Sequence, residues 1–178
     1  MKFVELKNIK VHHGLSEETF CFEASVYLEG KRIGTIANRG CGGANEIGIT
    51  ATEEKRIDSW LKENLTYTSY DGNKRPMDFE MWSFLEVEKH LQEKELKSLL
   101  NRSVVVMDDT CKHGECFRWN FKSYKKSKDE IIDGVTNMLK SSQQYKNPKV
   151  LNNMQFKKAY INFYAVSYTH LTLPTSKI

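Results

Sequence analysis

The chain of 178 residues has a hydrophobic fraction of 39%, a charged fraction of 28% and a formal net charge of +4. This composition is typical of a soluble globular domain, and no apolar run reaches the ~20 residues that cross a membrane, so a membrane-spanning protein is excluded. The N-terminus lacks the apolar core of a signal peptide, so we expect a cytoplasmic protein with reduced thiols at its four cysteines.

The first 38 residues are predicted to form three antiparallel strands. Residues 2–11 alternate polar and apolar side chains with one slip in register, and residues 19–28 alternate without a slip. Gly30, in the turn after the second strand, can adopt a positive φ. Residues 32–38 are therefore expected to return as the second strand of a hairpin.

Two helices are predicted in the middle of the chain. Thr50 and Glu53 have the spacing of a capping box, in which each side chain bonds the backbone of the other residue at a helix start. Asp78 can cap the start of the second helix. The predicted loops are residues 40–45 and 66–76, and the predicted helices follow Thr50 and Asp78, the second one ending near Leu100.

A second hairpin and a third helix are predicted in the last part of the chain. Residues 103–107 are mostly β-branched, and residues 108–115 are polar and predict a turn. Residues 116–121, which follow the turn, alternate aromatic and polar side chains and predict the returning strand. Phe117, Trp119 and Phe121 are expected to face the core. Ser127 and Glu130 repeat the capping-box spacing and predict a helix, which Asn147-Pro148 prevents from continuing.

The resulting order β-β-β-α-α-β-β-α predicts the fold class. Strands that come in hairpins favour an antiparallel sheet, whereas strands that alternate singly with helices favour a parallel one. We predict an α+β fold in which a sheet of two hairpins plus an N-terminal strand is covered by about three helices. Residues 1–152 are expected to form a single domain.

The glycine-rich loop is the first candidate site. Successive glycines allow backbone N–H groups to converge on an anion such as phosphate. However, the loop lacks the Lys-Ser/Thr pair of a P-loop and no helix follows it directly, so a simple turn explains the same residues. The residues that a ligand would meet are Asn38, Arg39, Gly40, Gly42, Gly43 and Asn45.

A metal site is the second candidate. Cys111, His113 and Cys116 place three ligands of the kind that zinc prefers within six residues. Zinc needs four ligands, and the second spaced pair of a zinc-binding motif is absent, so a hairpin turn is the alternative. His12, His13 and Cys41 are further donors that a fourth ligand could come from. Zinc is therefore a possible cofactor, and no cofactor is the default expectation.

Catalytic patterns are weakly supported. The adjacent carboxylates of Asp108 and Asp109 could bind magnesium or act as acid and base, but neighbouring residues at a strand end usually point apart. A cysteine nucleophile needs a positioned base, and no motif fixes that geometry. We find no arrangement typical of an enzyme.

A basic segment is the last candidate. Residues 1–101 carry 14 basic and 17 acidic residues, whereas residues 102–165 carry 12 basic and 6 acidic ones. Such a charge asymmetry could attract an anionic partner, but a solvated lysine-rich surface is the favoured explanation. The residues predicted to contact nucleic acid are Arg118, Lys122, Tyr124, Lys125 and Lys126, of which only the tyrosine looks free to stack on a base.

Part of the chain resembles a family of small uncharacterised phage and prophage proteins. The residues that carry the resemblance are Glu18-Thr19-Phe20-Cys21-Phe22-Glu23-Ala24, Tyr27-Leu28-Glu29-Gly30-Lys31 and Gly34-Thr35-Ile36-Ala37-Asn38-Arg39-Gly40-Cys41-Gly42-Gly43, with Val150-Leu151-Asn152 near the usual end of the family. The resemblance implies a phage-related protein in bacterial cytoplasm and implies no catalytic residues. It leaves residues 153–165 as an extension that the family pattern does not place.

The last residues resemble something different. Residues 166–175, VSYTHLTLPT, resemble the translation of a transposase mosaic-end sequencing adapter, of the kind found at the ends of interrupted metagenomic gene models. This resemblance implies that residues 166–178 are an artefactual tail of a truncated gene. A threonine-rich terminal strand is the alternative.

Together these observations predict a small phage-type accessory protein that acts as a binding module for nucleic acid or for a host or phage protein. The alternative is an enzyme that depends on a metal or a phosphate ligand, built on the loop at Gly40–Gly43 or on Cys111, His113 and Cys116. A purely structural or inhibitory surface is a third hypothesis.

Overall fold

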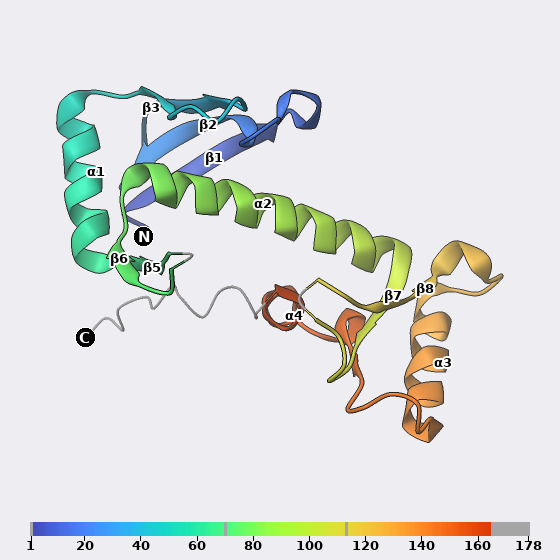
Figure 1. Ribbon diagram of the computed structural model, residues 1–178. Coiled ribbons are helices and arrows are strands. Elements are labelled where there is room, and N and C mark those ends of the chain that lie inside the picture. The colour runs from blue at the N-terminus through green and yellow to red at the C-terminus, as the bar shows by residue number, and fades with distance from the viewer. Residues whose placement is uncertain (1, 70, 113, 165–178) are drawn as a thin grey trace. The chain divides into compact units, whose positions relative to one another are not determined.

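The computed structural model describes residues 2–69, 71–112 and 114–164. The chain divides into two compact units, which within these residues are 2–91 and 92–164. The boundary lies inside helix α2 (Phe79–Arg102), so an unbroken helical pattern runs across it and the sequence shows no linker there. The predicted α+β class with antiparallel strands is confirmed (Figure 1). The tail 166–178 lies outside the described residues.

Unit 1 is built on a four-stranded antiparallel sheet in the order β1-β2-β3-β4. Its strands are β1 (Val4–Val11), β2 (Cys21–Leu28), β3 (Lys31–Arg39) and β4 (Glu46–Gly48), with a 3-10 turn η1 (His13–Leu15) after β1. Strand β4 was not predicted, because three residues are too few to show a period. The predicted turn is confirmed, with φ 49° at Glu29 and 82° at Gly30.

The predicted slip in the first strand is a β-bulge. The register between β1 and β2 shifts between Lys7 and Lys10, and Asn8 lies there with a φ of 54°. Asparagine adopts this left-handed conformation more readily than most residues, because its side chain can bond nearby backbone groups. The bulge lets side chains on both sides of it keep their apolar face toward the core.

One face of the unit 1 sheet is buried under helices. Alternate residues of β2 point inward and pack against helix α1 (Ala51–Asn64) and the first turns of α2 (Figure 1). The capping box of Thr50 and Glu53 is present as predicted. The core side chains shared by these elements are Phe22, Ala24, Val26, Leu28, Ile36, Ile57, Leu61, Met77, Phe79, Trp82 and Val87. A two-stranded ribbon, β5 (Thr66–Thr68) and β6 (Lys74–Pro76), replaces most of the loop predicted there.

Unit 2 contains a three-stranded antiparallel sheet in the order β8-β7-β9. The strands are β7 (Ser103–Met107), β8 (Phe117–Asn120) and β9 (Lys149–Val150), joined by the 3-10 turns η2 (Phe121–Ser123) and η3 (Leu151–Asn153) and by helices α3 (Lys128–Ser141) and α4 (Phe156–Tyr164). The two predicted hairpins therefore lie in separate sheets. The residues after Asn152, which the sequence pattern did not place, form α4, whose Ala159, Phe163 and Tyr164 are buried.

Strand β7 is buried on both faces. Val105 and Met107 pack with the second half of α2 and with α4, whereas Val104 and Val106 pack with α3 and Phe121. The predicted helix α3 is confirmed, with its capping box at Ser127 and Glu130. A sheet covered by helices on both faces favours consecutive apolar side chains in its central strand, which explains the apolar run at residues 104–107.

The side chain of Asn152 ties three backbone segments of unit 2 together. Its Oδ1 accepts a hydrogen bond from the Val105 amide at 2.7 Å, and its Nδ2 donates to the carbonyls of Leu100 at 3.1 Å and Ser103 at 3.0 Å. The amide thus links the last turn of α2 to the start of β7. Leu151 beside it is fully buried.

We expect Asn152→Ala to lower the free energy of unfolding by about 2–3 kcal/mol, because three hydrogen bonds worth about 1 kcal/mol each are lost. Asn153→Ala is the matched control, since Asn153 is exposed and its side chain donates a long hydrogen bond, of 3.4 Å, to the hydroxyl of Thr136. Urea denaturation measures both variants. Equal effects of the two substitutions would contradict the role given to Asn152.

Candidate functional site

Asn38 organises the glycine-rich loop of unit 1. Its Oδ1 accepts from the hydroxyl of Thr19 and the amide of Gly40, both at 2.8 Å, and its Nδ2 donates to the carbonyl of Gly43 and to Oδ1 of Asn45, both at 2.9 Å. All four hydrogen-bonding positions of this side-chain amide are filled, and the side chain is only 7% exposed. Asn38 therefore holds the loop in one conformation.

The glycines of the loop are required by close packing. At Gly40, φ is 87° and an added Cβ would lie 2.2 Å from the carbonyl oxygen of Leu15. The Gly40 carbonyl in turn accepts from the amides of Glu17, Glu18 and Thr19. A side chain at this position would push apart the two segments, so the turn explains the glycine without a ligand.

A hollow of about 230 Å³ lies beside the loop. It is lined by Gly42, Gly43, Asn38 and Asn45 from the predicted set, together with Phe84 and Glu80 of α2. The Asn45 amide donates to Glu80 Oε1 at 3.2 Å, and the Gly42 amide donates to the Thr19 hydroxyl at 3.3 Å.

The loop therefore offers little to an anion. The amides of Gly40, Gly42 and Asn45 already have acceptors, and the carboxylate of Glu80 lies at the hollow. A phosphate in the hollow would therefore meet the negative charge of Glu80, and the amides of Gly42 and Asn45 would have to give up their present acceptors to bind it. Arg39, the cation in the predicted set, is exposed and forms an ion pair with Glu46. Ligand binding by this loop stays a prediction.

Substituting Asn38 tests its structural role. We expect Asn38→Ala to lower the free energy of unfolding by about 2–4 kcal/mol, because buried backbone groups lose their partners. Asn38→Asp should be comparably destabilising, since a carboxylate oxygen would face two acceptors. Arg39→Ala, which removes an exposed ion pair, should cost less than about 1 kcal/mol. Thermal melts followed by circular dichroism provide the comparison, and a neutral Asn38→Ala variant would refute the role.

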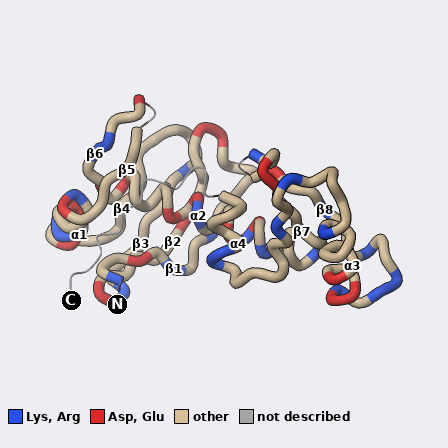
Figure 2. Tube along the Cα trace, turned by 90° about the horizontal axis from the view of Figure 1, so that it is seen from below, with Lys and Arg blue, Asp and Glu red and all other residues tan. Residues whose placement is uncertain are grey.

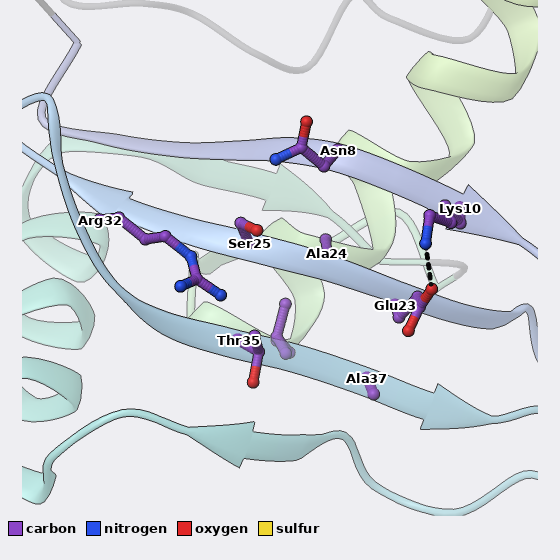
Figure 3. A pocket seen from close by; sticks show the side chains of 9 residues that line it. Asn8, Lys10, Glu23, Ala24, Ser25, Arg32, Thr35 and Ala37 are labelled. Atoms are coloured by element: carbon purple, nitrogen blue, oxygen red, sulfur yellow. Dashed lines mark hydrogen bonds and ion pairs between the residues drawn. The ribbon is translucent and has the colours of Figure 1, made fainter.

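A second hollow of unit 1 lies on the exposed face of its sheet (Figure 3). It measures about 300 Å³ and is floored by the small side chains of Ser25, Thr35 and Ala37. Lys10 at its edge lies 2.9 Å from the carboxylate of Glu23, so these two charges largely cancel. None of the described residues that line this hollow is aromatic, and sequence analysis did not single it out.

In unit 2, the turn after β7 holds the predicted metal residues. Cys111 and Cys116 pack against the core cluster of α2 and α4, and burial raises the pKa of both thiols. His113 lies outside the described residues. Among the residues that the structure describes, no group of three or more His, Cys, Asp or Glu side chains is arranged to hold a metal. A zinc site at this turn stays a prediction.

The two histidines and the cysteine that could complete a zinc site belong to the other unit. His12, His13 and Cys41 are residues of unit 1, whereas Cys111 and Cys116 are residues of unit 2. A raised pKa keeps a thiol protonated at neutral pH. The protonated thiol is unreactive, because only the thiolate attacks a substrate or binds a metal. The cysteines of this turn are therefore poor candidates for a nucleophile.

Asp108 stabilises the same turn. Its Oδ1 accepts from the Thr110 hydroxyl at 2.6 Å, from the Thr110 amide at 2.9 Å and from the Cys111 thiol at 3.5 Å, and its Oδ2 accepts from the Lys146 amide at 3.2 Å. The Thr110 hydroxyl is the main reason that the pKa of Asp108 falls to about 2, against the opposing effect of burial. Asp109 separately accepts from Asn147. Both carboxylates therefore form hydrogen bonds that stabilise the turn. Magnesium binding by this pair stays a prediction.

The lowered pKa makes a pH-dependent prediction. Because the folded-state pKa of about 2 lies below the unfolded value of about 3.9, ionised Asp108 stabilises the fold above pH ~4, and this contribution is lost as the pH falls through ~2. Asp108→Asn should be less stable than the native chain at pH 7, and the gap should narrow between pH 4 and pH 2. Denaturation midpoints at pH 7, 4, 3 and 2 measure the gap, and a constant gap would contradict the account.

Two of the five predicted nucleic-acid residues line a third hollow, in unit 2. It measures about 180 Å³ and lies between the end of β8, the connection that follows it and one face of α3. Tyr124 and Lys126 of the predicted set line it, together with Trp119, Gly134 and Met138. Tyr124 is 45% exposed and Met138 is 40% exposed, so apolar surface faces solvent here.

Local sequence places these side chains. Asn120 caps the turn η2, its Oδ1 accepting from the Lys122 amide at 3.3 Å, so the chain leaves the sheet directly after β8. Phe121 is buried and anchors this turn, while the capping box at Ser127 starts α3 a few residues later. The short connection between the two anchors carries Tyr124 and the lysines.

The expectation that Phe117, Trp119 and Phe121 all face the core is wrong in part. Only Phe121 is buried, because β8 is an edge strand and α3 covers just its last residues. Phe117 is 37% exposed and makes an edge contact with Tyr145, at 5.0 Å between ring centroids. Trp119 is half-buried and packs against the core cluster of β7 and α3, as expected. It also contacts Tyr145, at 6.3 Å between ring centroids, and lines the hollow.

The structure brings only part of the predicted set together. Arg118 pairs with Val105 in the sheet and so projects to the face opposite Trp119, as expected from strand alternation. Lys122 and Lys125 are exposed on the connection but do not line the hollow. Figure 2 shows basic positions in blue along this connection. Sequence reasoning missed Gly134 and Met138, although a glycine inside a helical pattern is a signal worth pursuing.

Comparison of the chain with protein-family models, with curated proteins and with solved structures finds no match. Among the described residues, no helix combines the length and the apolarity needed to cross a membrane. The assignment of function therefore depends on the geometry of the hollows and on charge.

Proposed function

We propose that this chain is a small accessory protein of phage type whose unit 2 binds nucleic acid. The binding region is the aromatic–basic surface, formed by Trp119, Lys122, Tyr124, Lys125 and Lys126. The observation that carries the proposal is the exposed aromatic hollow with a lysine at its rim, on a connection that holds further lysines. The resemblance of residues 18–43 to phage proteins supports the setting, in bacterial cytoplasm.

Charge supports an anionic partner. Residues 92–164 carry 14 basic and 8 acidic residues, a net charge of +6, whereas residues 2–91 carry 12 basic and 15 acidic ones, a net charge of −3. The positive charge attracts phosphates, and release of counterions from the nucleic acid supplies most of non-specific affinity. The aromatic side chains add base stacking, which is worth about 1–3 kcal/mol per base.

The charge itself can be tested by reversal. We expect a labelled oligonucleotide to bind at 50 mM salt and to dissociate as salt is raised. Lys125→Glu with Lys126→Glu should weaken binding and reduce the slope of log K against log salt by about 1.4, the value expected when two phosphate contacts to a single strand are lost. Fluorescence anisotropy across a salt series measures both quantities.

The matched control reverses the same charge elsewhere in unit 2. Lys157→Glu with Lys158→Glu changes two exposed lysines of α4, away from the aromatic–basic surface. If both double variants weaken binding equally, net charge alone explains it and the surface assignment is wrong. If the native chain binds no DNA or RNA at 50 mM salt, the proposed function is wrong and a protein partner becomes the leading hypothesis.

A further inference from the structure

We infer that the hollow between Trp119, Tyr124 and α3 receives one unpaired nucleobase, and that Gly134 keeps the hollow open for it. This inference rests on the proposed function and deepens it, since it names single-stranded nucleic acid as the preferred partner. It follows from the chemistry of the hollow, from its charge and from the position of a glycine within a helix.

The chemistry of the hollow suits a flat aromatic ring. Trp119 and Tyr124 provide aromatic surface, and Ile131, Val135 and Met138 provide apolar contacts from α3. Stacking on aromatic side chains is the main way in which proteins hold bases without reading their sequence. Sulfur also contacts aromatic rings favourably.

The charges at the hollow favour an anionic strand. Lys126 lines it, so a base placed inside would bring its own phosphate close to an ammonium group. Glu130 also lines it, but this carboxylate is bonded to the amide of Ser127 at 2.8 Å and to its hydroxyl at 2.7 Å. It lies in the first turn of α3, where the helix dipole offsets negative charge.

Nothing in the packing of α3 requires Gly134. A Cβ added there would meet no heavy atom within 4 Å, and the backbone of this residue is not in the left-handed region. A glycine in the exposed interior of a helix destabilises it relative to alanine. The helix therefore bears a stability cost at an exposed position that lines the hollow, where a side chain would take up part of the space.

An unpaired base fits this site better than a base pair. In a duplex the base faces are covered by their neighbours, so a ring can enter a side-chain hollow only after it leaves the stack. A single strand presents base faces at little cost. We therefore expect selectivity for single strands over duplexes of the same length and charge.

The decisive variant is Gly134→Leu. Leucine favours helix and fills the hollow, so this variant should raise the melting temperature and weaken binding of a single-stranded 12-mer about fivefold or more, which corresponds to loss of one stacked base. Duplex binding should change little. Because stability and binding move in opposite directions, unfolding cannot explain the loss.

Two controls accompany it. Asn137→Leu adds the same side chain to an exposed position of α3 that does not line the hollow, and should leave binding unchanged. A 2-aminopurine base in the oligonucleotide should lose fluorescence on binding to the native chain and keep it with Gly134→Leu.

The outcomes separate the two proposals. Binding of single strand and duplex with equal affinity, unaffected by Gly134→Leu, would overturn the base-binding inference and leave the nucleic-acid function intact. An absence of binding to either form at 50 mM salt would overturn the proposed function itself.

Discussion

Every side chain of β7 is buried, and this burial constrains the architecture of unit 2. Each fully buried valine contributes roughly 1.5–3 kcal/mol only if both faces of the sheet are covered. Helices α2 and α4 cover one face, and α3 together with Phe121 covers the other. Because β8 must leave the sheet to let α3 cross back, the connection between them lies at the surface. The exposed aromatic hollow is a consequence of that crossing.

Both units use a side-chain amide to fix backbone that regular structure leaves unpaired. Asn38 fills all four of its bonding positions within the glycine-rich loop, and Asn152 bonds the end of α2 and the start of β7. In both units, a side-chain amide therefore supplies hydrogen bonds that the local backbone does not supply to itself.

Local signals in the sequence predicted much of the fold. The capping boxes at Thr50 and Ser127, the turn at Gly30 and the bulge in β1 depend on neighbouring residues, so they are visible without tertiary contacts. Strands β4 and β9 are too short to show a period, and α4 acquires its buried face only by packing in unit 2. The division of strands among sheets depends on long-range pairing, which periodicity does not encode.

The candidate site was predicted less completely for the same reason. Tyr124 and Lys126 were identified because they are adjacent in sequence to other basic residues. Trp119 was assigned to the core, against which it does pack, but its place in the hollow was not predicted. Alternation shows which residues share a face but not how far a helix covers that face. Gly134 and Met138 join the site from a helix that begins after the connection, so only the fold places them there.

The bulge at Asn8 has a consequence for self-association. Strand β1 is an outer strand of its sheet, and an unbroken strand of that length presents a row of hydrogen-bonding groups to any extended chain in solution. The displaced backbone at Asn8 and the ammonium groups of Lys7 and Lys10 interrupt that row. The opposite outer strand, β4, is only three residues long. Both edges of the sheet therefore disfavour strand pairing between molecules, which is the first step of fibril growth.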